Sequence, residues 1–196
     1  LTKNLTKNLT KINYSQDLRN YSVPVHYSLG SSKFMFALWL LLGRPLLNSY
    51  IPGTFWRKSL LRMFGAQVGV GGRIKTRINI TFPWKLKIGN YCWIGENVWI
   101  DNIDFIKISD RSCISQGAYL CTGNHDYKSD KFNLISKPIL IESDSWIGAY
   151  SRIAPGTIVG KGVVVSFGSV VSGNLPSFKI VKGNPAIIVG ERKIKY

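Results

Sequence analysis

The chain has 196 residues, of which 26 are Lys or Arg and 10 are Asp or Glu, so its formal charge is +16. Hydrophobic residues make up 45% and charged residues 18%, which excludes a disordered chain and a coiled coil, and the 19 glycines favour a turn-rich β protein. The charge is uneven: residues 1–95 hold 14 basic residues and one acid, a net +13, while residues 96–196 hold 12 and 9, a net +3. The N-terminal half should therefore attract anions.

The three cysteines, Cys92, Cys113 and Cys121, do not form a CxxC pair. Neither a disulfide framework nor a zinc knuckle is expected, and we expect a cytoplasmic protein that needs no metal. The longest apolar run, residues 34–42, is about half as long as a bilayer span, so the sequence predicts no membrane crossing.

The N-terminal third precedes any repeat. Residues 1–32 are interpreted as an N-terminal extension that begins with a leucine repeat, at Leu1, Leu5 and Leu9. Residues 33–66 contain two apolar stretches broken by glycine and proline, which predicts two short helices. Basic residues interrupt these stretches, so the segment is either a helical cap on the main domain or an anchor at an anionic membrane surface.

From residue 68 a branched aliphatic residue recurs every six positions. All fifteen positions carry Ile, Leu or Val: Val68, Ile74, Ile80, Ile88, Ile94, Ile100, Ile108, Ile114, Leu120, Ile141, Ile147, Ile153, Val159, Val165 and Val171. An α-helix cannot place every sixth residue on one face, whereas short strands joined by tight corners can. The repeat therefore predicts a β solenoid whose axis is filled by aliphatic side chains.

Three hexads form one turn, and the five groups begin at Val68, Ile88, Ile108, Ile141 and Val159. Every excess residue falls after a third hexad, and the large excess is a loop at residues 122–138. The predicted fold class is all-β: a single-stranded parallel β-helix of about five coils at residues 67–174, with the helical segment before it and a C-terminal tail at residues 175–196.

Several motifs carry a family resemblance. The hexads, with CTGNHDY at 121–127, the run WIGAYSRIAPGTIVGKGVVVSFGSVV at 146–171 and KGNPA at 182–186, resemble the hexapeptide-repeat acyltransferases. Residues 62–69, 81–100 and 114–127 resemble in particular the sugar O-acetyltransferases of bacterial exopolysaccharide synthesis. The resemblance implies a left-handed β-helix, a homotrimer with active sites between subunits, acetyl-CoA as donor and a saccharide hydroxyl as acceptor, nucleotide- or lipid-linked.

His125 lies in the long loop and is the candidate catalytic base, because imidazole can remove a hydroxyl proton near neutral pH. The sequence leaves its partner open among Asp126, a backbone carbonyl, and a carboxylate such as Glu142 or Asp144. Direct attack in a ternary complex is favoured over a thioester on Cys121.

The resemblance also implies a set of residues that line the groove for coenzyme A, with a cation for its phosphate. This set comprises Trp146, Ala149, Ser166, Phe167, Gly168, Ser172 and Arg192. The bulky Phe167 and the sequence Ser172-Gly173-Asn174 depart from the family pattern, and Lys179, Lys182 or Lys193 is the candidate replacement for a lysine that is absent there.

Four residues are assigned to the acceptor: Glu96, Tyr119, Asn124 and Asp126. Tyr119 belongs to a group of aromatic residues that could stack on a sugar or pack between subunits.

Other functions were weighed. A trimeric zinc carbonic anhydrase needs three histidine ligands, and only His125 lies in the repeat. Nucleic-acid binding is not expected, because the basic residues precede the repeat rather than line it. The remaining alternative is a non-catalytic trimeric binding or assembly module. In either case residues 33–64 are expected to make peripheral contact with an anionic inner leaflet.

Overall fold

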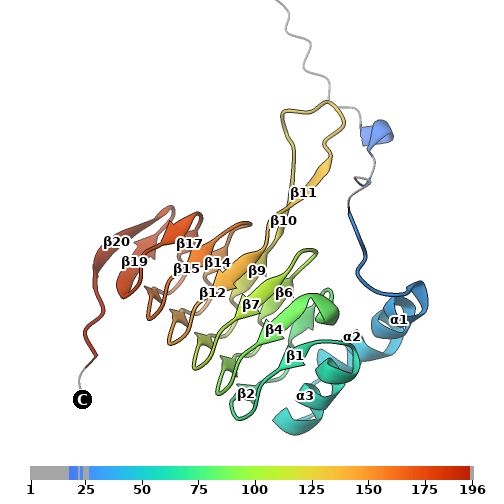
Figure 1. Ribbon diagram of the computed structural model, residues 1–196, viewed down its shortest axis with the longest axis horizontal. Coiled ribbons are helices and arrows are strands. Elements are labelled where there is room, and N and C mark those ends of the chain that lie inside the picture. Colours follow the sequence, from blue (N-terminus) through green and yellow to red (C-terminus); the bar gives the residue numbers. More distant parts are fainter. Residues whose placement is uncertain (1–17, 22, 24–26, 195–196) are drawn as a thin grey trace, which may run out of the picture.

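The computed structural model describes residues 18–194 apart from 22 and 24–26, so the predicted leucine repeat lies outside the described residues. The chain folds into a parallel β-helix with helices at its N-terminal end, a projecting hairpin near its middle and a second hairpin at its C-terminal end (Figure 1).

The β-helix has three faces, each a sheet of short strands. Face A contains β1 (Gln67–Val68), β4 (Leu86–Ile88), β7 (Ile106–Ile108), β12 (Ile139–Ile141), β15 (Ile158–Val159) and β18 (Asn174–Leu175). Face B contains β2 (Arg73–Ile74), β5 (Trp93–Ile94), β8 (Cys113–Ile114), β13 (Trp146–Ile147), β16 (Val164–Val165), β19 (Lys179–Gly183) and β20 (Ala186–Glu191). Face C contains β3 (Asn79–Ile80), β6 (Trp99–Asp101), β9 (Tyr119–Cys121), β14 (Arg152–Ile153) and β17 (Val170–Val171).

The hexad aliphatics form the predicted axial column. Fourteen of the fifteen are buried and Val68, in the first turn, is half-buried. The parallel register stacks them directly, as Ile94 on Ile114 and Ile114 on Ile147. Burying each such side chain stabilises the fold by about 1.5–3 kcal/mol. The predicted parallel β-helix is confirmed.

The corners explain the other regular positions of the hexad. At most corners the third residue after the aliphatic has a positive φ, for example Asn97 at 56° and Gly117 at 67°. The residue directly after the aliphatic is often glycine, because a Cβ on Gly95 would lie 2.5 Å from the backbone nitrogen of Gln116. The small fourth residue points inward, and Ser145 satisfies its hydroxyl on the carbonyl of Gly160 at 2.9 Å.

The coil count differs slightly from the prediction of five coils and a tail. Five turns are complete, and β18 and β19 continue faces A and B as a partial sixth turn. The sequence concealed it because Leu175 follows Val171 after four residues rather than six. Strand β20 then pairs antiparallel with β19 and covers the last edge of face B.

Every insertion lies at the corner from face C to face A, as the spacing predicted. The first holds a short 3-10 helix, Pro83–Lys85. The third is the predicted loop, which contains a hairpin of β10 (Gly123–His125) and β11 (Leu134–Ser136). We call residues 122–138 the arm. It projects away from the β-helix and passes close to the 3-10 helix Leu18–Asn20 (Figure 1).

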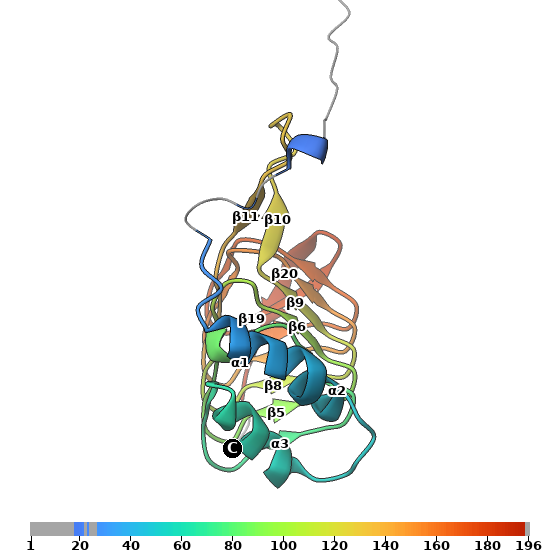
Figure 2. The same cartoon turned by 90° about the vertical axis from the view of Figure 1, so that its right-hand side faces the viewer.

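The N-terminal helices cover the first turn of the β-helix (Figure 2). One continuous helical stretch comprises α1 (Lys33–Leu38), a π-helical segment (Trp39–Gly43) and α2 (Arg44–Leu47), and α3 (Thr54–Met63) follows. The indole of Trp39 donates to the carbonyls of Ile80 and Thr81, and buried Arg57 donates to three carbonyls of the connecting loop. In the described part of the chain, no helix is long and apolar enough to cross a membrane.

Candidate active site

The arm positions His125 outside the β-helix. His125 ends β10 and lies opposite Leu134 of β11 in the antiparallel register. Beyond the two strands the chain turns at residues 126–133, where the backbone N–H of Asp126 donates to the carbonyl of Asn133. The hairpin therefore holds the histidine at a fixed distance from the axial column.

The imidazole of His125 is oriented by Phe132. Its Nδ1 lies 3.0 Å from the carbonyl oxygen of Phe132, and the two rings stack in parallel with centroids 4.3 Å apart. Because a carbonyl oxygen can only accept, Nδ1 carries the proton, and in the neutral ring Nε2 keeps its lone pair. That is the arrangement a general base needs.

Among the partners that the sequence left open, the backbone carbonyl is the one the structure shows. Asp126 accepts instead from the backbone N–H of Lys128, and Glu142 from that of Lys161. Asp144 forms an ion pair with Arg111 at 2.6 Å.

The predicted acceptor residues divide into three places. Asn124 and Asp126 flank His125, and the side chain of Asn124 accepts from the backbone N–H of His125 at 2.8 Å. Tyr119 lies on face C directly before the arm. Glu96 lies at the corner from face B to face C, where it accepts from the hydroxyl of Thr76.

Sequence reasoning missed Asp101, which joins Tyr119 in a polar cluster at the foot of the arm. The carboxylate of Asp101 accepts from the hydroxyls of Thr81 at 2.9 Å and Tyr119 at 3.0 Å. Burial, then the neighbouring Cys121 and Asp101, raise the pKa of Tyr119. The available signal was an acid where several other turns have glycine or alanine.

Cys121, the alternative nucleophile, is half-buried beside this cluster. Its thiol lies 3.3 Å from the carbonyl oxygen of Gly123 and 4.0 Å from the carboxylate of Asp101. Both neighbours are hydrogen-bond acceptors, and neither is a cation that would stabilise a thiolate.

The residues predicted to hold coenzyme A are spread around one chain rather than gathered. Ser166, Phe167 and Gly168 form a corner between faces B and C, directly over Ala149, and exposed Phe167 packs edge-on against Tyr150 at 5.7 Å. Ser172 lies at a corner between faces C and A.

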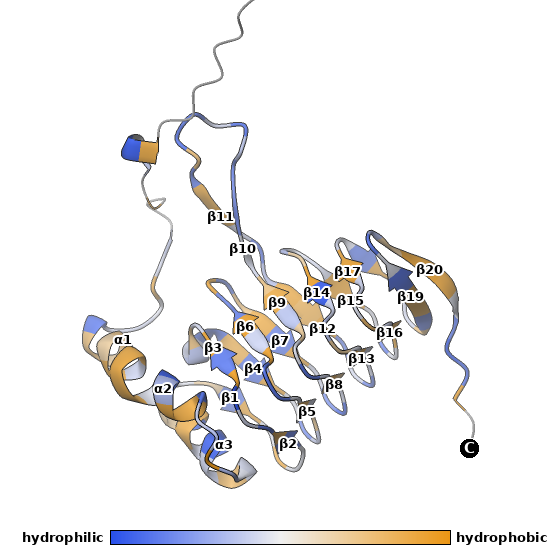
Figure 3. Cartoon of the chain, turned by 180° about the vertical axis from the view of Figure 1, so that it is seen from behind, coloured by the Kyte–Doolittle hydropathy of each residue, from blue (hydrophilic) through white to orange (hydrophobic). Residues whose placement is uncertain are grey.

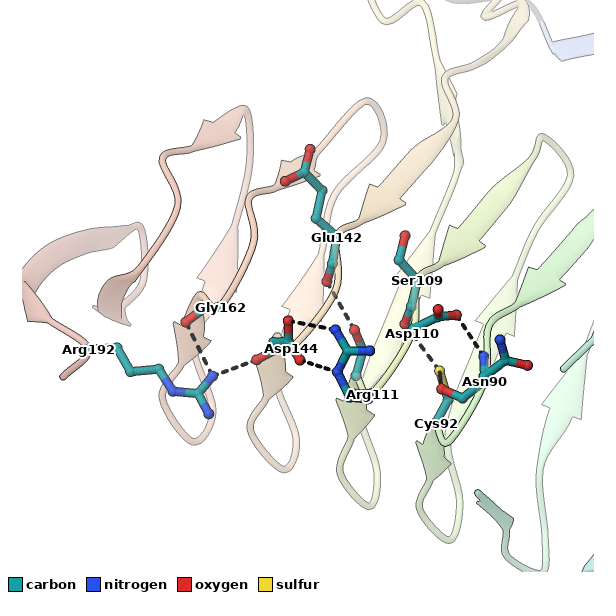
Figure 4. Close-up of polar contacts among 10 residues, drawn as sticks. Asn90, Cys92, Ser109, Asp110, Arg111, Glu142, Asp144, Gly162 and Arg192 are labelled. Carbon is teal, nitrogen blue, oxygen red and sulfur yellow. Dashed lines mark hydrogen bonds and ion pairs between the residues drawn. The ribbon is translucent and has the colours of Figure 1, made fainter. Parts of the chain in front are cut away.

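Arg192 lies at the third edge, between faces A and B. Its guanidinium donates to the carbonyls of Asp144 and Gly162, beside the ion pair of Asp144 with Arg111 (Figure 4). One chain therefore does not bring Arg192 and the corner at Ser166 into one pocket.

Two residues that were predicted to bind different ligands, the acceptor and coenzyme A, lie close together. Glu96 and Trp146 line the same cavity of about 490 Å³ on face B, and its other lining residues are Lys75, Trp93, Gly95, Cys113, Ile114, Ser115 and Gln116. The indole of Trp146 donates to the hydroxyl of Ser115 at 2.8 Å. In the part of the chain that the structure describes, no group of three or more His, Cys, Asp or Glu side chains could hold a metal ion.

Comparison with known proteins finds a matching family model and similar relatives. A family model described as bacterial transferase hexapeptide (six repeats) matches residues 138–173. The proposed colanic acid biosynthesis acetyltransferase WcaF of Escherichia coli (strain K12) is 37% identical over 179 residues, covering 90% of this chain and 97% of that protein.

A solved structure shares the fold. The hexapeptide-repeat acetyltransferase VCA0836 of Vibrio cholerae, in complex with acetyl-coenzyme A, superimposes with a TM-score of 0.75 and 26% identity. The match covers 84% of this chain and 92% of that one.

Proposed function

The chain belongs to the hexapeptide-repeat acetyltransferases, and from that membership we propose that it transfers acetyl from acetyl-CoA to a saccharide hydroxyl in bacterial surface or exopolysaccharide synthesis. Two relatives support the donor and the pathway: VCA0836 is complexed with acetyl-coenzyme A, and WcaF is assigned to colanic acid synthesis. The observation that carries the chemistry is His125, whose Nδ1 faces the carbonyl of Phe132 and leaves Nε2 as the base.

The proposed reaction is direct transfer in a ternary complex. Nε2 of His125 takes the proton of the acceptor hydroxyl while the hydroxyl oxygen attacks the carbonyl carbon of the thioester. The C–O bond forms, the C–S bond breaks, and coenzyme A leaves as a thiolate that recovers the proton from the imidazolium. General-base assistance of this kind contributes about 10²- to 10⁴-fold to the rate.

The proposed donor site lies between neighbouring copies in a homotrimer. Ser166–Gly168 and Arg192 occupy different edges of one chain, so edges of two chains are needed to surround one coenzyme A. In the same trimer, the cavity that Glu96 and Trp146 share on face B would be completed by a neighbouring copy. Trp146, Ala149 and Phe167 would line the pantetheine arm, and Ser172 and Arg192 the phosphate end.

The helical cap is the proposed contact with an anionic membrane surface. Phe34 is 76% exposed, Leu41 75% and Phe55 83%, although the opposite sides of these helices pack on the first turn of the β-helix. Figure 3 shows hydrophobic colour along α1 and α2. A helix that is apolar on both sides is normally covered.

The charges around this cap fit an anionic lipid as the covering partner. Lys33, Lys58 and Arg62 lie on the cap, and residues 18–95 contain no Asp or Glu. Each basic residue close to an anionic leaflet contributes about 1 kcal/mol. The proposed location is therefore cytoplasmic and peripheral at the inner leaflet, where a lipid-linked acceptor would lie.

The reaction is tested by coenzyme A release with p-nitrophenyl glycosides as acceptors. We expect His125→Ala to lower kcat by about 10²- to 10⁴-fold with an unchanged Kd for acetyl-CoA, while Tyr127→Ala, on the same arm, keeps the wild-type rate. Full activity in His125→Ala contradicts the role of His125. A wild-type protein that is trimeric and binds no coenzyme A supports the non-catalytic module instead.

The membrane contact is tested by flotation with vesicles of phosphatidylethanolamine and phosphatidylglycerol. The wild type should float, and Phe34→Ser/Leu41→Ser/Phe55→Ser should not. A matched control, Tyr91→Ser/Tyr127→Ser/Ile187→Ser, removes three other exposed large hydrophobic residues, which are 64–77% exposed and lie elsewhere, and should float. Equal flotation of both variants, or assemblies that pair through the cap without vesicles, would overturn the proposal.

A further inference from the structure

A second cavity lies at the root of the arm, and none of the residues that line it has been assigned a role above. Its volume is about 390 Å³, and four separate segments form its walls. The N-terminal segment contributes Tyr27, Ser28 and Gly30, the face C to face A corners of the first two turns contribute Trp84, Lys85 and residues 103–105, and β11 contributes Leu134 and Ser136. We call it the root cavity.

The root cavity lies on the side of the arm that carries His125. Leu134 is directly opposite His125 in the antiparallel pair, and Ser136 is opposite Gly123. Side chains of directly opposed residues point to the same face of a hairpin, with Cβ atoms about 4.5–5.5 Å apart. The base and a wall of the cavity are therefore cross-strand neighbours.

Two described parts of the N-terminal segment lie close to the arm. Tyr21 places its ring 5.9 Å from that of His125, and Tyr27 and Ser28 reach the cavity. The segment is held there by the indole of Trp84, which donates to the carbonyl of Leu29 at 2.7 Å, and by Lys85, which donates to that of Ser28 at 2.6 Å. Residues of one chain thus line the cavity and contact the base.

The polar groups of the cavity suit a ligand rich in hydroxyls. The carboxylate of Asp104 accepts from the hydroxyl of Ser136 at 3.0 Å and from the backbone N–H of Phe105 at 2.7 Å. A carboxylate offers about four lone-pair sites, so acceptor capacity remains. Two of the three N–H groups of Lys85 go to the carbonyls of Ser28 and Ile103, which leaves one donor.

The apolar walls narrow the ligand class further. Trp84 and exposed Phe105 offer aromatic surface beside Asp104, the combination on which a pyranose ring places its C–H face and its hydroxyls. The carboxylate of Asp104 and the ammonium of Lys85 both line the cavity and offset each other's charge, which favours a neutral ligand. The volume lies near the lower end for small-molecule sites and so suits a single ring.

We propose that the root cavity binds a neutral sugar ring of the acceptor, adjoining the ring whose hydroxyl reaches His125. This rests on the proposed saccharide O-acetyltransferase function. The cavity would then select the acceptor by the sugar next to the acetylated one, and the first two corner insertions exist to form its walls.

The kinetic test uses p-nitrophenyl disaccharides with the wild-type chain and two variants, Asp104→Asn and Phe105→Ala. We expect both variants to raise the acceptor KM with an unchanged Kd for acetyl-CoA, and Asp104→Asn to raise it by about 10- to 100-fold, as for loss of a hydrogen bond to a charged group. The matched controls, Asp130→Asn and Tyr91→Ala, should keep the wild-type KM. Unchanged KM in both cavity variants overturns the inference while leaving acetyl transfer intact.

A binding measurement separates failure of the cavity from failure of the reaction. In protein labelled with 5-fluorotryptophan, methyl glycosides should shift the ¹⁹F signal of Trp84, assigned with Trp84→Phe, whether or not turnover occurs. Coenzyme A should shift that of Trp146 instead. Glycosides that shift Trp99 on face C and leave Trp84 unmoved would contradict the root cavity as a sugar site.

Discussion

Two edges of the same β-helix differ in the length of their corners and in the side chains they carry. At the edge from face A to face B the corners are short, and side chains bridge consecutive turns: Asp110 accepts from the backbone N–H of Asn90, and Arg111 pairs with Asp144 (Figure 4). At the edge from face C to face A the chain carries its insertions, including the arm with His125. The repeat is regular where it stabilises the fold and irregular where the candidate chemistry lies.

The largest expected effect on this difference between the two edges comes from a substitution in the axial column. Ile147 is fully buried and stacks between Ile114 and Val165. We expect Ile147→Ala to lower the free energy of unfolding by about 2–5 kcal/mol, since it leaves a cavity in a packed core. Thermal unfolding followed by circular dichroism measures this. A change below about 1 kcal/mol would mean that the column is not the main source of stability.

A substitution on the arm should instead lower activity and leave stability nearly unchanged. Phe132 stacks on His125 and supplies the carbonyl that fixes Nδ1. Phe132→Ala keeps the carbonyl and loses the stacking, so we expect kcat to fall by about 5-fold, as an aromatic contact of roughly 1 kcal/mol is lost, while Tm is nearly unchanged. Steady-state kinetics beside a melting curve checks both, and Phe132→Tyr, which keeps the ring, should restore the rate.

The smallest expected effect is at the regular edge. The hydrogen bond and charge of Arg111 lower the pKa of Asp144 below its usual value. A carboxylate with a depressed folded pKa contributes stability above its unfolded pKa and loses it as pH falls through the folded value. Because Arg111 is exposed and Asp144 only half-buried, the pair is screened by solvent, so Asp144→Asn should lower Tm only slightly near neutral pH, and the difference from wild type should vanish in acid. A difference that grows on acidification would contradict the assignment.

The sequence predicted what repeats and missed what does not. The axial column and the position of every insertion followed from the spacing of Ile, Leu and Val, because each hexad must present one aliphatic side chain to the axis. The partial sixth turn was missed because Leu175 is out of phase. The arm was predicted only as a loop, since the register of β10 and β11 depends on pairing rather than on periodicity.

The candidate site divides in the same way. His125 could be found from a motif, whereas the carbonyl of Phe132 has no sequence signal, because every residue carries one. Asp101 was overlooked because an acid also follows the hexad aliphatic at Glu142, so residue type alone did not single it out. The residues expected to hold coenzyme A are separated within one chain, and sequence alone does not say which edges meet in an assembly.

The most direct measurement is a paired one on His125→Ala and Ile147→Ala. For both proteins, kcat/KM for coenzyme A release is measured at a temperature where both are folded, and Tm is taken from a melting curve. We expect His125→Ala to lose at least about 10²-fold in kcat/KM with an unchanged Tm, and Ile147→Ala to lose Tm with kcat/KM near that of the wild type. If His125→Ala keeps its rate, or if both variants lose activity and Tm together, chemistry and stability are not divided between the arm and the column.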